Sequence, residues 1–232
     1  MSLAAAYMFG RKQAIPQNIV YLGNVSSFIT SAADMVAKST LLESEILDFT
    51  IDGANVTFKT DTDYSLRSSS FQSTSITYYR DYKHLTINAS NEFRSSSIVD
   101  FVAMKTSSLG NGTFLFSQLQ TFTTPECTYI NATTFRGSKI VIADLQNVTY
   151  VQSYSSLSSG NFTDCAFIQL INLDSCTTLG DSDGSTNEGV FQNIKTGCVI
   201  NVNSFLQTNN GGNPDANLQY AINSRGAIVN YV

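Results

Sequence analysis

Phenylalanine recurs at a nearly constant interval through the middle of the chain, and this period constrains the fold more than any other feature. Each of these residues is followed by two or three small or polar residues and then by apolar residues about three apart. The six positions are Phe71, Phe93, Phe116, Phe135, Phe162 and Phe191, with spacings of 22, 23, 19, 27 and 29 residues. A period of about 20 to 50 residues is typical of repeat proteins. We therefore expect residues 71–202 to form one repeat array.

The unit that begins at Phe162 indicates how such a repeat would pack. The positions expected to face inward are Phe167, Leu170, Leu173, Cys176 and Leu179. A three-residue step fits neither a helix nor a plain strand, and it suits a chain that winds around a narrow core. One turn of such a chain cannot bury its own apolar edge, so the turns must stack and bring parallel strands side by side. A series of unrelated β-hairpins is the alternative interpretation.

Further matches between the units indicate a family. The sequences before Phe93 and Phe135 share an order of apolar residue, Asn, Ala, polar residues and Phe, and Cys165 follows Phe162 by three residues. With these features, and with Leu-Gln-Asn-Val-Thr-Tyr-Val at 145–151, residues 71–202 resemble the irregular leucine-rich repeats of BspA-type bacterial surface proteins. A phage tail or virion protein carrying the same repeats would look identical.

The resemblance implies a mainly β, leucine-rich-repeat-like right-handed solenoid of about six irregular coils. It also implies a non-enzymatic surface or virion-associated recognition module that binds a protein or a glycan. The expected location is therefore extracellular, on a cell surface or in a virion.

A stacked array needs caps at both ends, because its terminal turns would otherwise expose the core. Residues 1–70 are the predicted N-terminal cap. Apolar residues at helical spacing predict a helix over residues 27–47. Asp52-Gly53 between two apolar segments, 47–51 and 56–58, predicts a β-hairpin.

Residues 203–232 are the predicted C-terminal cap. Asn213 is the expected helix N-cap, with Pro214 at the first helical position. Gly226 is expected to end this helix, and residues 227–232 alternate as a closing strand would. We expect the caps and the array to form one structural domain.

The charge balance argues against nucleic acid as a partner. Against 18 acidic residues there are 13 Lys and Arg, which gives a net charge of -5 and no basic field for phosphates. No apolar run approaches the roughly 20 residues that span a bilayer, so no membrane insertion is expected. No cofactor is expected either, because neither a glycine-rich nucleotide motif nor an H-E-x-x-H zinc motif occurs.

All the cysteines lie in the repeats, at Cys127, Cys165, Cys176 and Cys198. No two are spaced as C-x-x-C, the pattern of metal and redox sites. Their neighbours are small and apolar, so we expect buried free thiols. A bridge between Cys165 and Cys176 is the alternative.

The candidate binding residues are Tyr78, Tyr79, Tyr82 and His84, because rings with a polar group are common at binding surfaces. The alternative is that alternate rings of this segment pack inside an early repeat.

Catalysis has little support in the sequence. His84 is the only histidine, and the acids of the repeats occur about once per unit and out of phase with one another. A parallel β-helix polysaccharide-degrading enzyme, which needs paired carboxylates, is one alternative function, and a purely structural spacer is another. The segment with Asp181 and Asp183 could bind calcium but departs from the full calcium-loop spacing, so we expect a solvated turn.

Overall fold

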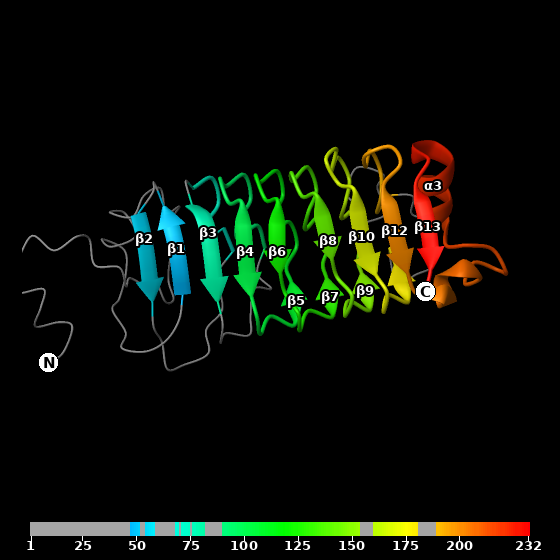
Figure 1. Ribbon diagram of the computed structural model, residues 1–232, viewed down its shortest axis with the longest axis horizontal. Coiled ribbons are helices and arrows are strands. Elements are labelled where there is room, and N and C mark those ends of the chain that lie inside the picture. Colours follow the sequence, from blue (N-terminus) through cyan, green and yellow to red (C-terminus); the bar gives the residue numbers. More distant parts are fainter. Residues whose placement is uncertain are drawn as a thin grey trace, which may run out of the picture.

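The computed structural model describes residues 47–51, 54–58, 68–69, 71–74, 76–81, 90–153, 160–180 and 189–232. Within these residues the chain is mainly β, with three sheets and two short helices. Strands β1, β2, β3, β4, β6, β8, β10, β12 and β13 are called the main strands. From β3 onward they follow one another in sequence order along the long axis (Figure 1). The elements are β1 Leu47–Ile51, β2 Ala54–Phe58, β3 Ile76–Asp81, β4 Asp100–Ala103, β5 Ser108–Leu109, β6 Thr121–Thr123, β7 Tyr129–Ile130, β8 Ile142–Asp144, β9 Tyr150–Val151, β10 Leu170–Leu173, β11 Thr178–Leu179, β12 Val199–Val202, the 3-10 helix η2 Ser204–Gln207, α3 Ala216–Arg225 and β13 Ile228–Tyr231.

The main strands form two sheets with the orders β2-β1-β3-β4-β6 and β13-β12-β10-β8. From β3 onward every pairing in these sheets is parallel. Partners on β4 and β6 lie 21 residues apart, and partners in the second sheet lie 28 or 29 apart. The third sheet, β11-β9-β7-β5, is also parallel. The predicted mainly β fold is confirmed, because strands in three sheets make up most of the regular structure of the described residues.

A column of stacked phenylalanine rings runs through the core. Neighbouring rings have their centroids 5.1 to 5.9 Å apart. The six members, all buried, are Phe71, Phe93, Phe114, Phe135, Phe162 and Phe191. The prediction of Phe116 as the third member is therefore wrong, because Phe114 takes that place and Phe116 is 45% exposed.

The backbone of the turn that carries each phenylalanine explains this correction. The residue two positions after each ring has a positive φ, and the six such residues are Ser73, Ser95, Phe116, Gly137, Asp164 and Asn193. The amide of Phe116 donates to the carbonyl of Arg136 at 2.8 Å. The amide of Gly137 donates to the carbonyl of Thr163 at 2.9 Å. The turn thus links successive units and directs the side chain of Phe116 away from the core.

In the unit that begins at Phe162, the predicted inward positions from Leu173 onward are buried. The predictions for Phe167 and Leu170 are wrong, since Phe167 is 55% exposed and Leu170 is half-buried. Their neighbours Ile168 and Ile171 are wholly buried instead. The three-residue step fails here because β10 begins at Leu170 and alternates with a period of two.

The predicted hairpin near the N-terminal end is confirmed. Strands β1 and β2 pair antiparallel, with Leu47 opposite Phe58 and Ile51 opposite Ala54. Strand β1 also pairs antiparallel with β3, so the hairpin extends the first sheet. The predicted helix over residues 27–47 lies outside the described residues, except for Leu47, which begins β1.

The C-terminal helix and strand are confirmed, but the helix begins later than predicted. Its N-cap is Asp215, whose carboxylate accepts a hydrogen bond from the amide of Asn217. Asn213 is not the cap, because it closes a turn with Asn210. Gly226, at φ 60°, ends the helix as expected. Strand β13 then pairs in parallel with β12.

Candidate functional site

The outward side chains of the second sheet form two rows across its strands, and we call these eight residues the strand face. One row is apolar and consists of Ile142, Leu170, Val199 and Ile228, which are register partners. The other row is polar and consists of Asp144, Asn172, Asn201 and Asn230. Ile142 is 51% exposed and Ile228 is 56% exposed. Alternate residues of a strand lie on the same side of the sheet. The eight side chains of the two rows therefore face outward, whereas the residues between them in each strand face the core.

The polar row is a continuous chain of hydrogen bonds. The side-chain amide of Asn230 donates to the amide oxygen of Asn201 at 2.8 Å, and Asn201 donates in the same way to Asn172 at 2.7 Å. Asn172 donates to Oδ1 of Asp144 at 3.2 Å. All three bonds run in one direction and end on a carboxylate. They hold the polar side chains in fixed positions, and such preorganisation lowers the entropic cost of binding.

The first sheet presents a different outward group around Tyr78. The guanidinium of Arg80 lies 4.3 Å from the centre of the Tyr78 ring and 3.7 Å from Oδ2 of Asp100. The hydroxyl of Thr121 donates to Oδ1 of Asp100 at 2.6 Å. Arg80 and Asp100 are both about a third or more exposed, so their ion pair adds little stability.

The candidate residues of the sequence divide between the surface and the core. Tyr78 is half-buried and outward, whereas Tyr79 is wholly buried against the rings of Phe93 and Phe101. A buried ring cannot contact a ligand, so Tyr79 belongs to the core. This agrees with the alternative interpretation, in which alternate rings of the segment pack inside an early repeat. Tyr82 and His84 lie outside the described residues.

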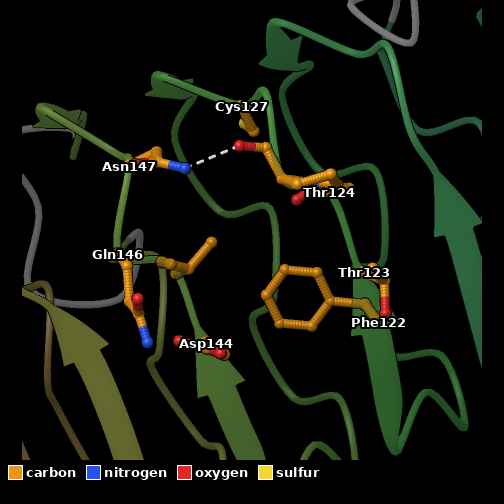
Figure 2. Close-up of a pocket in the computed structure, with 9 residues that line it drawn as sticks. Phe122, Thr123, Thr124, Cys127, Asp144, Gln146 and Asn147 are labelled. Carbon is orange, nitrogen blue, oxygen red and sulfur yellow. Dashed lines mark hydrogen bonds between the residues drawn. The ribbon is translucent and has the colours of Figure 1, made fainter.

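A pocket of about 180 Å³ lies at the junction of the two main sheets. Strands β6 and β8 are neighbours, but they belong to separate hydrogen-bonded sheets (Figure 1). Figure 2 shows the Phe122 ring projecting from one unit toward the segment 144–147 of the next. The amide of Asn147 donates to the carbonyl of Pro125 at 2.7 Å and bridges the two units at one side. Asp144 lines this pocket and also ends the polar row of the strand face.

Sequence reasoning missed both the strand face and the pocket. The asparagines recur in sequence at the strand spacing, and this signal could have located the polar row. The pocket has no such signal, because it depends on two units that do not pair by a regular strand ladder.

The cysteine prediction is confirmed, since all four cysteines are buried and free. Burial raises the pKa of Cys127 to about 11 and that of Cys165 to about 12. It also raises the pKa of Cys176 and of Cys198 to about 12. Nucleophilic attack and metal binding both need the thiolate, so these thiols suit neither role at neutral pH.

Within the described part of the chain, no three His, Cys, Asp or Glu side chains gather as a metal site would require. Asp181 and Asp183 of the possible calcium segment lie outside that part. No helix of the described residues is both long and apolar enough to cross a membrane. Comparisons with protein-family models, curated proteins and solved structures found no match to the chain.

Proposed function

We propose that the chain is a non-enzymatic recognition module of a cell surface or virion, which binds a protein or glycan through the strand face. Its fold would be a leucine-rich-repeat-like right-handed solenoid. Parallel pairing at one repeat length supports this fold, as do the phenylalanine column and the recurring left-handed turns.

The observation that carries the proposal is the apolar row beside the fixed amide row. Ile142 and Ile228 are more than half exposed at the two ends of the apolar row. Apolar area that is free to be covered favours binding, and aligned amides supply directional contacts. A structural spacer has no need of such a row on its surface, so the strand face favours recognition.

The enzyme alternative calls for carboxylates that converge on one site. On the outward side of the main sheets, Asp100 and Asp144 occupy different rows, and strand β6 lies between their strands. Each is already hydrogen-bonded, Asp100 by the hydroxyl of Thr121 and Asp144 by the amide of Asn172. This arrangement gives the pair of acids no shared substrate position, which favours a binding role.

The test is a binding screen of the purified chain against glycan arrays and cell-surface protein fractions. The variant is Ile142→Ser/Ile228→Ser, which removes the exposed ends of the apolar row. The matched control is Phe167→Ser/Phe205→Ser, because these side chains are 55% and 57% exposed but lie outside the main strands. We expect the first variant to lose binding and the second to keep it. Equal binding by both variants, or no ligand in any screen, would contradict the proposal.

A further inference from the structure

We propose that the pocket between β6 and β8 receives a lysine side chain of a protein that lies on the strand face. This inference rests on the proposed function, and it names the ligand chemistry of one part of the same surface. Asp144 connects the two, because it lines the pocket and ends the polar row.

The charge of the pocket favours a cation. Among the described residues, Asp144 is the one charged side chain that lines it, and no Lys, Arg or His does so. The chain as a whole carries a net charge of -5, which favours a basic ligand over an acidic one. An anionic ligand would meet a carboxylate without a compensating charge.

Asp144 and Asn147 supply side-chain oxygens that can accept hydrogen bonds within the pocket. Oδ1 of Asp144 accepts the amide of Asn172, and among the described residues no donor contacts its Oδ2. The amide group of Asn147 uses its nitrogen on the carbonyl of Pro125, which leaves its oxygen as an acceptor. An ammonium group carries three donors and no acceptor, so it matches this set.

Lysine fits better than arginine for a geometric reason. A guanidinium binds a carboxylate best as a fork on both oxygens, whereas one oxygen of Asp144 already accepts the amide of Asn172. An ammonium is a compact point charge that needs only the other oxygen. The rings of Phe122 and Pro125 and the side chain of Leu145 also line the pocket and suit the apolar stem of lysine.

A sugar ring is the less favoured occupant. A neutral hydroxyl makes a weaker hydrogen bond to a carboxylate than an ammonium group does, so Asp144 favours the cation. A pocket of about 180 Å³ is also small beside typical ligand sites of about 300 Å³ or more, which suits a single side chain.

The test is an NMR titration of the full ¹⁵N-labelled chain with Nα-acetyl-lysine-N-methylamide. The matched probe is the norleucine analogue, which has the same stem and no ammonium group. We expect saturable shift changes at the amides of residues 122–127 and 144–147 with the lysine probe only. Asp144→Asn should raise the Kd at least tenfold, because its amide oxygen can still accept from Asn172 but carries no charge. Asp100→Asn, which changes the net charge equally on the same side, should leave the Kd unchanged.

A second pair of variants keeps the test independent of Asp144. Gln146 is exposed and lines the pocket, so Gln146→Lys supplies an internal competitor and should weaken binding of the probe. Gln120→Lys adds the same charge at an exposed position before β6 and should not.

Equal shifts with the norleucine analogue, or an unchanged Kd in Asp144→Asn, would overturn the inference. Shifts at the pocket with methyl hexosides and none with lysine would overturn it in favour of a sugar. None of these outcomes decides the proposed function, which the binding screen of Ile142→Ser/Ile228→Ser tests separately.

Discussion

Asn217, in the first turn of α3, repeats the hydrogen bonds that Asn161 makes inside the repeat array. The amide of Thr134 donates to the side-chain oxygen of Asn161 at 3.0 Å, and Asn161 donates to the carbonyl of Gln152. The amide of Val190 donates to the side-chain oxygen of Asn217 at 3.3 Å, and Asn217 donates to a carbonyl of β11 at 3.5 Å. The helix therefore satisfies the backbone of the last unit as another unit would.

The residues after these asparagines extend the comparison. Phe162 follows Asn161 and belongs to the phenylalanine column, and Leu218 follows Asn217 and is also wholly buried. Strand β13 then pairs with β12 in the register of a further unit. The C-terminal cap thus closes the core by substituting a helix for the turn of a repeat.

Replacement of Asn217 by alanine should lower the free energy of unfolding by about 1–3 kcal/mol, because it leaves a buried amide and a carbonyl without partners. Urea denaturation measures this change, and hydrogen exchange of the β13 amides shows whether the cap opens first. Asn223→Ala is the control, since Asn223 is exposed on the same helix. Equal stability of the two variants would contradict the proposed equivalence of Asn217 and Asn161.

Regular features of the sequence predicted regular features of the fold. The Asp-Gly pair located the hairpin, the apolar surroundings of the cysteines predicted their burial, and Gly226 located the end of α3. Each of these signals is local, and each has a strong conformational or solvation cause.

The errors arose where backbone conformation decides which side a residue faces. Phe114 and Phe116 are equally apolar, and only the left-handed φ of Phe116 separates core from surface. Tyr78 and Tyr79 have the same side chain, and only the start of β3 determines which of them is buried. The pocket adds a contact between separate units, across Asn147 and Pro125, that no local pattern encodes.

The corrected position of the core ring gives a direct test. Phe114→Ala should lower the free energy of unfolding by about 3–5 kcal/mol, because it opens a cavity between stacked rings. Phe116→Ala should change it by less than about 1 kcal/mol, because the ring is 45% exposed. Thermal and urea denaturation of the two variants measure the difference. The opposite order would restore Phe116 to the column.

Gly137 should tolerate alanine poorly for two separable reasons. Its φ is 65°, and a Cβ atom would lie 2.4 Å from Cδ1 of the Phe116 ring. Gly197 has φ 73° but open space around it. We expect Gly197→Ala to cost about 1 kcal/mol for the backbone alone and Gly137→Ala to cost more.

A double-mutant cycle separates the two terms. Adding Phe116→Ala to Gly137→Ala removes the ring that the new Cβ atom meets, so the double variant should recover part of the lost stability. If the losses of unfolding free energy in the two single variants simply add in the double variant, the Phe116 ring is not what destabilises Gly137→Ala.

The buried thiols predict a loss of stability at high pH. The pKa of Cys165 rises from 9.0 to about 12 in the folded chain because of burial. Between these values the unfolded chain loses a proton that the folded chain keeps, so unfolding becomes more favourable as the pH rises. The stabilising effect is complete below pH 9 and is lost as the pH rises toward 12.

Cys165→Ala isolates this contribution. Relative to the native chain, the variant should show a shallower fall of the unfolding free energy between about pH 9.5 and 11, by about 1.4 kcal/mol per pH unit. Ser138→Ala is the control, because Ser138 is buried beside Cys165 and does not titrate in this range. It should lower stability at every pH without changing the slope. Urea denaturation at each pH gives the unfolding free energy and its slope with pH. Identical slopes in the native chain and in Cys165→Ala would mean that this thiol ionises as readily in the folded chain as in the unfolded one.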